Sequence, residues 1–414
     1  MIRATRTQWI KFAVVLALYL IFLVWLRSWL GLVVVPFIFD AYITKKIPWT
    51  WWRESKNRHV VTVMGWVDAI VFALVAVYFV NLYFFQNYVI PSSSLEKSLL
   101  TGDYLFVSKM SYGPRVPQTP LHMPLAQHTL PFFNCKSYLE HPQWDYKRVK
   151  GLGDVQLNDI VVFNFPAGDT VATGVPNDDI YRLSYGAGKE LAKPVDLASM
   201  TPEQQRVVYD YYYQLGREYL KENPQNFGEI ISRPVDRREN YVKRCVGLPG
   251  QTLEIKDRII YLDGKANKEP DNVQYRYLVK TKRPIPDDLA HELGISKEDM
   301  MMYYTDASVY NMPLTEKAKA GLLARKDIVV SIENTPADDA GGLYPLNMYK
   351  NWTTDNYGPV WIPKKGETVK LTIENLPVYE RPIHVYEGNE LAVKDGKIYI
   401  NGKETDEYTC LLYT

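Results

Sequence analysis

The chain has 414 residues, of which 47% are hydrophobic and 23% are charged, so it can bury a sizeable core and is not disordered by default. Lys and Arg total 48 against 47 for Asp and Glu, and the resulting net charge of +1 predicts no nucleic-acid partner. Three widely separated cysteines and six histidines without close spacing fit neither a disulfide framework nor a metal centre, so we expect no catalytic metal and no cofactor.

Two apolar stretches near the N-terminus have the composition of membrane segments. Residues 66–85 contain, after Asp68, only Asn81 as a strongly polar side chain, and they are long enough to cross a bilayer as a helix. Residues 13–39 are interrupted by Arg27 and Ser28. This earlier stretch forms either one long tilted span or two short segments in a hairpin, and the sequence leaves both open.

The charges around these stretches predict the topology. The loop over residues 45–58 is basic, which places it in the cytoplasm and the chain after residue 86 outside. Arg3, Arg6 and Lys11 also favour the cytoplasm, which a hairpin satisfies and a single first span does not. We expect a first membrane segment at 1–43, a basic cytoplasmic loop at 44–62, a transmembrane helix at 63–86 and an extracytoplasmic β-rich domain at 87–414.

The remainder of the chain is mostly strand-like. Residues 103–109 (DYLFVSK) and 159–165 (DIVVFNF) are β-branched and aromatic runs bounded by turn residues, which predict core strands. Residues 253–265 and 391–403 share a strand, a turn, a second strand and a closing Gly-Lys, which predicts two β-hairpins of one design.

Helical patterns occur in the connecting regions. Residues 201–204 (TPEQ) form a capping-box pattern before a predicted helix over 206–223, and residues 314–325 begin just after Pro313 and also favour a helix. The segments at about 113–157, 170–238 and 266–350 are interpreted as insertions on a β core rather than as separate domains.

Two motifs carry candidate chemistry. Residues 90–95 (IPSSSL) follow directly after the second membrane stretch, and residues 241–250 (YVKRCVGLPG) place Lys243 on an apolar strand before a Gly-Leu-Pro-Gly turn. Each motif alone has an ordinary explanation, because Ser-rich turns are usually solvated linkers and strand lysines usually extend to water.

Together with residues 102–113 (GDYLFVSKMSYG) and the DIVVF strand, these motifs resemble type I signal peptidases, in the family's order, over about residues 60–265. The SSSL sequence of this motif resembles the form of the signal peptidase motif found in Bacteroidetes-type bacteria. The resemblance implies a mainly β, signal-peptidase-like catalytic domain with helical insertions, preceded by N-terminal transmembrane helices.

The resemblance also implies the site residues. Ser94 attacks the scissile carbonyl, Lys243 accepts its proton, and the Ser94 N–H and the Ser92 hydroxyl stabilise the oxyanion. A lysine that is neutral at pH 7 needs its pKa lowered by about three units, or roughly 4 kcal/mol, which burial can supply. Shallow pockets for Ala-sized side chains are implied at Ile90, Pro91, Leu95, Tyr241 and Val242, although ordinary strand packing explains each of these equally well.

The implied substrates are the signal peptides of secretory pre-proteins, met at the lipid bilayer. The implied location is the bacterial cytoplasmic (inner) membrane, with the catalytic domain on the periplasmic side. We find no counterpart of the family's Gly-Asp-Asn-Arg segment, since the chain ends at residues 410–414, soon after the second hairpin.

A truncated copy is therefore expected, and the alternative function is a catalytically impaired homologue that acts as a membrane-anchored scaffold. Self-cleaving repressors use a related Ser/Lys pair but are soluble and bind DNA, and a transporter does not fit the large soluble region.

Overall fold

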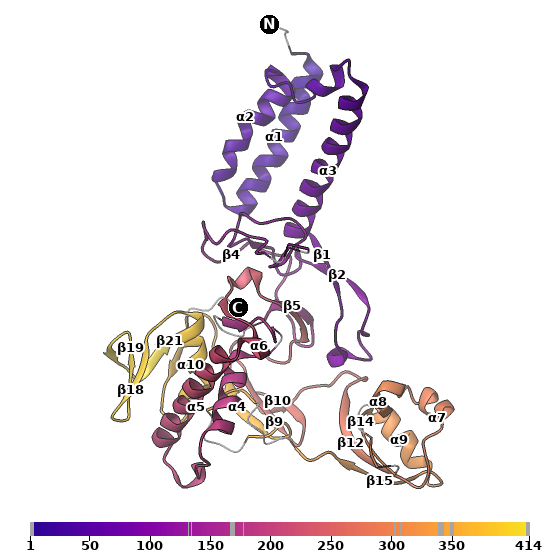
Figure 1. Cartoon of the computed structure of the whole chain (residues 1–414), viewed down its shortest axis with the longest axis vertical. Coiled ribbons are helices and arrows are strands. Elements are labelled where there is room, and N and C mark those ends of the chain that lie inside the picture. Colours follow the sequence, from indigo (N-terminus) through magenta and orange to yellow (C-terminus); the bar gives the residue numbers. More distant parts are fainter. Residues whose placement is uncertain are drawn as a thin grey trace. The chain divides into compact units, whose positions relative to one another are not determined.

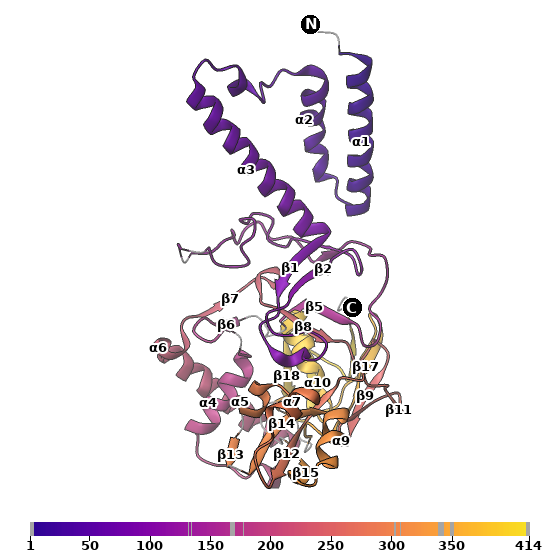
Figure 2. The ribbon, with the colours of Figure 1, turned by 90° about the vertical axis from the view of Figure 1, so that its right-hand side faces the viewer.

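The computed structural model describes residues 4–130, 132–133, 135–165, 170–176, 178–301, 304–306, 308–337, 343–347 and 352–410. These residues form two units. The first comprises Met1–Pro91, Thr101–Val155 and Pro234–Asn240, and the second comprises Ser92–Leu100, Gln156–Arg233 and Tyr241–Thr414. Figures 1 and 2 show the labelled elements from two directions.

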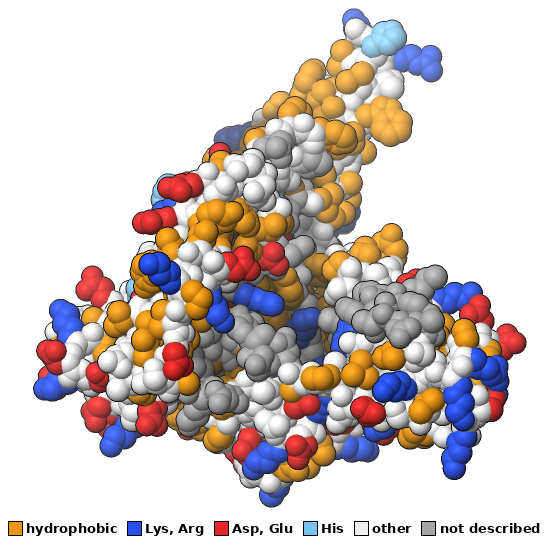
Figure 3. All heavy atoms as spheres, turned by 60° about the horizontal axis from the view of Figure 1, so that its bottom comes forward, with side chains coloured by type: hydrophobic (Ala, Val, Ile, Leu, Met, Phe, Trp, Pro, Cys, Tyr) orange, Lys and Arg blue, Asp and Glu red, His pale blue; other side chains and the backbone are white. Residues whose placement is uncertain are grey.

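The first unit begins with helices of membrane-spanning length and composition. Helices α1 (Arg6–Leu26) and α3 (Arg58–Tyr83) are long and apolar enough to cross a membrane. Their hydrophobic side chains are exposed along most of their length, as the orange surface in Figure 3 shows. The transmembrane helix predicted at residues 63–86 overlaps α3, which begins at Arg58 and ends at Tyr83, so the last three predicted residues lie outside the helix. As a helix, the apolar run satisfies its own backbone hydrogen bonds.

The first apolar stretch folds as a hairpin. Helix α1 is capped at its C-terminus by Arg27, whose φ of 50° is left-handed, and the chain returns through η1 (Leu30–Val34), α2 (Val35–Phe39) and η2 (Asp40–Thr44). Gly31 permits the close return, since a Cβ there would lie 2.2 Å from Leu23 Cδ2. The Phe12 and Phe39 rings contact each other across the hairpin, with centroids 5.4 Å apart, and Figure 2 shows α1 and α2 side by side.

The polypeptide after α3 forms two small antiparallel ladders. Strand β1 (Phe85–Val89) pairs with β2 (Tyr104–Ser108), which confirms the strand predicted at 103–109, and β3 (Arg115–Val116) pairs with β4 (Lys147–Arg148).

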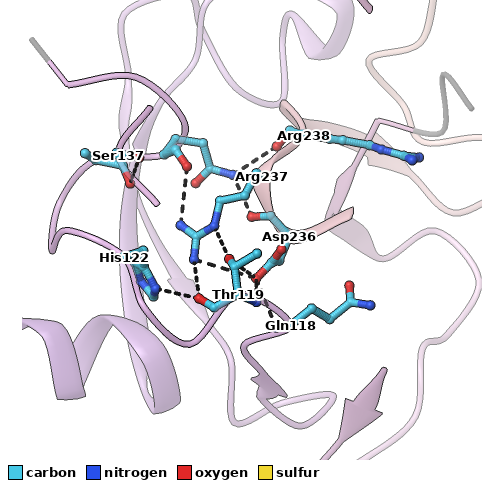
Figure 4. Close-up of polar contacts among 9 residues, drawn as sticks. Gln118, Thr119, His122, Ser137, Asp236, Arg237 and Arg238 are labelled. Atoms are coloured by element: carbon cyan, nitrogen blue, oxygen red, sulfur yellow. Dashed lines mark hydrogen bonds and ion pairs between the residues drawn. The ribbon is translucent and has the colours of Figure 1, made fainter. Parts of the chain in front are cut away.

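The insertion between β3 and β4 has little regular structure and is held by a buried ion pair. Asp236 and Arg237 lie in η6 (Val235–Arg237) and are 8% and 5% exposed. The Asp236 carboxylate accepts hydrogen bonds from the Gln118 N–H and from the N–H and hydroxyl of Thr119, and the Arg237 guanidinium donates to Thr119 and Gln127 (Figure 4).

The second unit contains the remaining sheets. Strands β5 (Ile160–Asn164) and β8 (Asn240–Arg244) pair, as do β6 (Thr170–Ala172) with β7 (Ile230–Ser232) and β17 (Thr368–Lys370) with β21 (Glu407–Thr409). A four-stranded sheet has the order β11 (Lys265–Ala266), β10 (Ile259–Leu262), β9 (Thr252–Lys256) and β16 (Tyr357–Trp361). Strand β5 confirms the strand predicted at 159–165.

The predicted internal repeat is also confirmed. Strands β9 and β10 form one hairpin, and β18 (Leu391–Lys394) and β19 (Lys397–Ile400) form the other, which continues into β20 (Lys403–Glu404). Asp395 and Gly396 have φ of 50° and 72°, and Asn401 and Gly402 have 52° and 77°. Two consecutive positive φ values are the conformation that tight hairpin turns require, and Asp-Gly and Asn-Gly favour it.

A pair of helices lies between β6 and β7. These are α4 (Ile180–Leu191) and α5 (Pro202–Glu222), followed by α6 (Pro224–Phe227). The predicted capping box forms at Thr201 and Gln204, and it fixes the start of α5. Gly188 and Gly216 let α4 and α5 cross closely, because a Cβ on Gly188 would lie 1.8 Å from the Tyr212 carbonyl oxygen.

The segment predicted as an insertion at 266–350 contains a small α/β layer with its own core. Its sheet has the order β13 (Tyr304–Asp306), β14 (Val309–Thr315), β12 (Gln274–Thr281) and β15 (Val329–Asn334), packed with α7 (Asp287–Glu292), α8 (Lys297–Met301) and α9 (Glu316–Ala324). The helix predicted from residue 314 starts later, since Leu314 and Thr315 still pair with β12. A last short helix pair, α10 (Leu376–Arg381) and η7 (Pro382–Tyr386), packs beside β17–β19.

Candidate active site

Ser94 lies on a short turn in the second unit. The turn is η4 (Ser93–Leu95), and it is closed by hydrogen bonds from the Glu96 N–H to the Ser93 carbonyl (2.9 Å) and from the Leu99 N–H to the Leu95 carbonyl (2.8 Å). Ser92, before the turn, is extended with φ −144° and ψ 155°. Ser94 is exposed to solvent.

Lys243 reaches this hydroxyl from strand β8. Its ammonium Nζ donates a hydrogen bond to Ser94 Oγ at 2.6 Å. The strand is held on one side by β5, and the ladder is extended by hydrogen bonds between Cys245 and residues 158–159. Two side chains that the sequence separates by 149 positions thus meet in the folded chain.

The electrostatics of Lys243 favour loss of its proton. Partial burial lowers the pKa of the Lys243 amine, because the low-polarity surroundings destabilise the charged form. The side chain nevertheless remains exposed, so the dry pocket expected around it is incomplete in this structure.

Two hydrogen-bond donors that the sequence analysis singled out lie near the Ser94 hydroxyl. Ser92 Oγ is 3.5 Å from Ser94 Oγ, at the outer limit of a hydrogen bond. The Ser94 N–H belongs to the first turn of a helix, where backbone donors have no intrahelical acceptor. One backbone donor and one hydroxyl donor therefore lie next to Ser94 Oγ.

The residues expected to contact substrate lie in different surroundings. Leu95 and Val242 are half-buried in the second unit, and the Tyr241 ring stacks on Phe165 with centroids 4.5 Å apart.

Ile90 and Pro91 belong to the first unit. Ile90 is only 3% exposed, and its backbone pairs with Gly102 and Asp103, whereas Pro91 is exposed.

Arg244 is a site residue that the sequence did not reveal. Its guanidinium donates to Ser98 Oγ at 3.0 Å and to the Asn158 carbonyl at 2.9 Å. Arg244 lies on β8, the strand that also carries Lys243. From there it holds both the segment that follows the Ser94 turn, at Ser98, and the chain just before β5, at Asn158. The neighbouring Lys-Arg pair in YVKRCVG was the available signal, but the partners of Arg244 lie far away in sequence.

None of the three cysteines forms a disulfide, and in the described ranges no group of three His, Cys, Asp or Glu side chains is placed to hold a metal ion. Cys245, two residues after Lys243, is half-buried, and its thiol donates to the Gly247 carbonyl.

Comparison with known proteins identifies related sequences. The family model described as signal peptidase, peptidase S26, matches residues 63–291. Signal peptidase I P from Bacillus subtilis subsp. natto is 20% identical over 279 residues, which is 67% of this chain and 90% of that protein. Signal peptidase I from Helicobacter pylori (strain ATCC 700392 / 26695) is 42% identical over 56 residues, 14% of this chain and 18% of that protein.

Signal peptidase I from Bacillus amyloliquefaciens is 30% identical over 93 residues, 22% of this chain and 47% of that protein. The matches to the last two relatives thus span less than half of their length. No solved structure matches the chain.

Proposed function

Because the chain belongs to the signal peptidase family, peptidase S26, we propose that it is a membrane-bound serine endopeptidase that removes signal peptides, with Ser94 as nucleophile and Lys243 as general base. The observation that carries the proposal is the 2.6 Å hydrogen bond between Lys243 Nζ and Ser94 Oγ. A general base must lie within hydrogen-bonding distance, about 2.6–3.2 Å between heavy atoms, of the group whose proton it removes.

The reaction has two halves. In the first, neutral Lys243 takes the hydroxyl proton while Ser94 Oγ bonds to the scissile carbonyl carbon, and the resulting ammonium then gives the proton to the departing amine. An acyl-enzyme remains on Ser94. In the second half Lys243 takes a proton from water, the hydroxide attacks the ester, and Ser94 recovers its proton.

The environment of Lys243 supports its role as base. Because burial lowers its pKa, a larger share of the amine is neutral near pH 7 than for an exposed lysine. The bound peptide completes the desolvation, so the base becomes strongest when substrate is present.

The oxyanion is stabilised by the Ser94 N–H and the Ser92 hydroxyl. The 3.5 Å separation of the two serine hydroxyls leaves Ser92 Oγ free to rotate toward the developing charge rather than toward Ser94. Loss of one such donor typically lowers the rate by roughly 10²- to 10³-fold.

The substrates are signal peptides of exported pre-proteins. Only strand β1 separates the end of α3 from the IPSSSL motif, so Ser94 follows a membrane helix closely along the chain. In the second unit, Leu95, Tyr241 and Val242 are the residues that we expect to contact small substrate side chains, and Ile90 and Pro91 of the first unit remain candidates from the motif alone. The basic loop at 45–58 faces the cytoplasm, which puts the catalytic residues on the periplasmic side of the inner membrane.

The test is cleavage of a model pre-protein by the purified full chain. Ser94→Ala and Lys243→Arg should abolish turnover, because the first lacks the nucleophile and the second carries a guanidinium that keeps its proton at neutral pH. Lys265→Arg, an exposed strand lysine in the same unit, is the matched control and should cleave normally. Cleavage by Ser94→Ala, or binding without cleavage by the unaltered chain, would refute the proposal.

A further inference from the structure

Basic side chains gather in the first unit where its long helices end. Lys109 directly follows β2, and its N–H donates at 2.8 Å to the carbonyl of Phe84, the residue that caps the C-terminus of α3. Arg115 and Arg148 are directly opposite each other in the β3–β4 ladder, and β3 contacts α3. The charges of both guanidinium groups act on the Lys109 amine.

The same ladder is attached to the end of α1. Lys147 Nζ donates at 2.7 Å to the carbonyl of Arg27, the C-terminal cap of α1, and Trp25 Nε1 donates at 3.3 Å to the Lys150 carbonyl. Both helices of membrane-spanning length therefore end at the level of the three basic side chains. Trp25 beside them is typical of a residue at the membrane–water interface.

The three cations lack a carboxylate partner. Lys109 and Arg115 are half-buried and Arg148 lies at the exposed rim. In the part of the chain that the structure describes, none of the three forms an ion pair. Arg148 donates only to the Tyr146 hydroxyl at 3.0 Å and the Gly113 carbonyl at 2.8 Å.

Among the described residues, the carboxylate of Asp236 influences Arg115 electrostatically, but it is already engaged with Arg237 and Thr119.

This imbalance is costly in the absence of a ligand. Burial, together with the charges of Arg115 and Arg148, lowers the pKa of Lys109 to about 8. Burial likewise lowers the pKa of Arg115. Half-buried like charges without an opposite charge destabilise the fold, and a bound anion removes that cost.

We propose that Lys109, Arg115 and Arg148 bind the phosphate group of an anionic phospholipid where α1 and α3 leave the membrane. Planar guanidinium groups match phosphate oxygens through paired hydrogen bonds, and an ammonium adds a compact charge. The proposal rests on the membrane anchoring in the proposed function. A lipid source is favoured over a free anion because both helix ends bring the cluster to the headgroup level.

The test uses the full chain in a neutral detergent and follows its melting by tryptophan fluorescence. Three additives are compared: dihexanoylphosphatidylglycerol, dihexanoylglycerol without phosphate, and inorganic phosphate. Binding to the folded protein alone raises the melting temperature in a saturable way. We expect a rise with the phosphatidylglycerol, none with dihexanoylglycerol, and one with inorganic phosphate only at concentrations at least about tenfold higher.

Two variants and a control locate the site. Arg148→Gln, at the exposed rim, should raise the phosphatidylglycerol concentration for half of the shift by about tenfold, the loss expected for one charge-assisted hydrogen bond. Lys109→Met should melt higher than the unaltered chain without lipid, because an uncompensated charge is gone, and should gain less from lipid. Lys265→Gln, exposed in the second unit, should behave like the unaltered chain.

Equal responses of the unaltered chain and both variants would overturn the site. An equal effect of dihexanoylglycerol would assign the stabilisation to the acyl chains, and an equal effect of inorganic phosphate would replace the lipid by a soluble anion. Ser94→Ala should respond to lipid like the unaltered chain, so a failure of the catalytic proposal and a failure of this one give different results.

Discussion

Replacing Asp236 by Asn should strongly destabilise the first unit. Asn keeps the shape of the side chain but removes the negative charge beside Arg237, whose guanidinium lies 3.6 Å from the carboxylate with both side chains 6% exposed. Burial lowers the pKa of Arg237, and the Asp236 charge opposes that shift. Removing one partner of a buried ion pair typically costs about 3–5 kcal/mol.

The assay is thermal melting of the full chain, combined with limited proteolysis of the insertion at 117–146. A loss of 3–5 kcal/mol corresponds to a fall in melting temperature of roughly 6–20 °C for a unit of this size. Proteolysis should accelerate within the insertion, because Asp236 holds Gln118 and Thr119 there.

A double-mutant cycle isolates the pair. Arg237→Met alone should also destabilise the unit, whereas Asp236→Asn with Arg237→Met should cost less than the sum, since no unpaired charge remains. Lys256→Gln, which removes an exposed ion pair with Glu254, is the control and should leave the melting unchanged. Additive effects of the two changes, or an Asp236→Asn variant that melts like the unaltered chain, would refute the reasoning.

Three further outcomes are expected. Because the neutral form of Lys243 is the base and burial lowers its pKa from 10.5, kcat/KM should rise with pH through that lowered pKa, and a flat profile up to pH 10.5 would contradict this. Arg244→Lys keeps the charge, but a lysine cannot reach both Ser98 and the Asn158 carbonyl, so kcat should fall by about tenfold with KM little changed. A change confined to KM would indicate a role in binding instead. Gly188→Ala should destabilise the fold by about 1–3 kcal/mol and lower the melting temperature, because the new Cβ would lie 1.8 Å from the Tyr212 carbonyl oxygen. Unchanged melting would show that α4 and α5 can separate freely.

Local interactions explain what could be predicted from the sequence. The start of α5 follows from the Thr201–Gln204 capping box, and the hairpin at 391–403 follows from Asp395-Gly396, whose positive φ values few other pairs adopt. The long apolar run of α3 is equally self-contained, since a helix satisfies its own backbone. In each case the deciding partners lie within a few residues.

Where local sequence patterns favoured more than one structure, contacts with distant residues determined where an element begins or ends. Residues 314–315 favour a helix by pattern, yet they end β14 because β12 pairs with them. In the hairpin at Arg27, Gly31 lies close to Leu23 and the Phe12 ring contacts the Phe39 ring, and composition does not encode these contacts. The separate core of the small α/β layer around Met312 also required strands from distant parts of the insertion.

The sequence by itself determined the residue types of the candidate site, the membrane-type helices and the repeated hairpin, because these are recorded in short motifs and periodicities. Only the tertiary structure decided that Lys243 reaches Ser94, that Arg244 anchors the turn at Ser98, and that Lys243 stays partly exposed. Those contacts join segments far apart in the chain, so their geometry depends on how strands pair and on what each side chain finds beside it after folding.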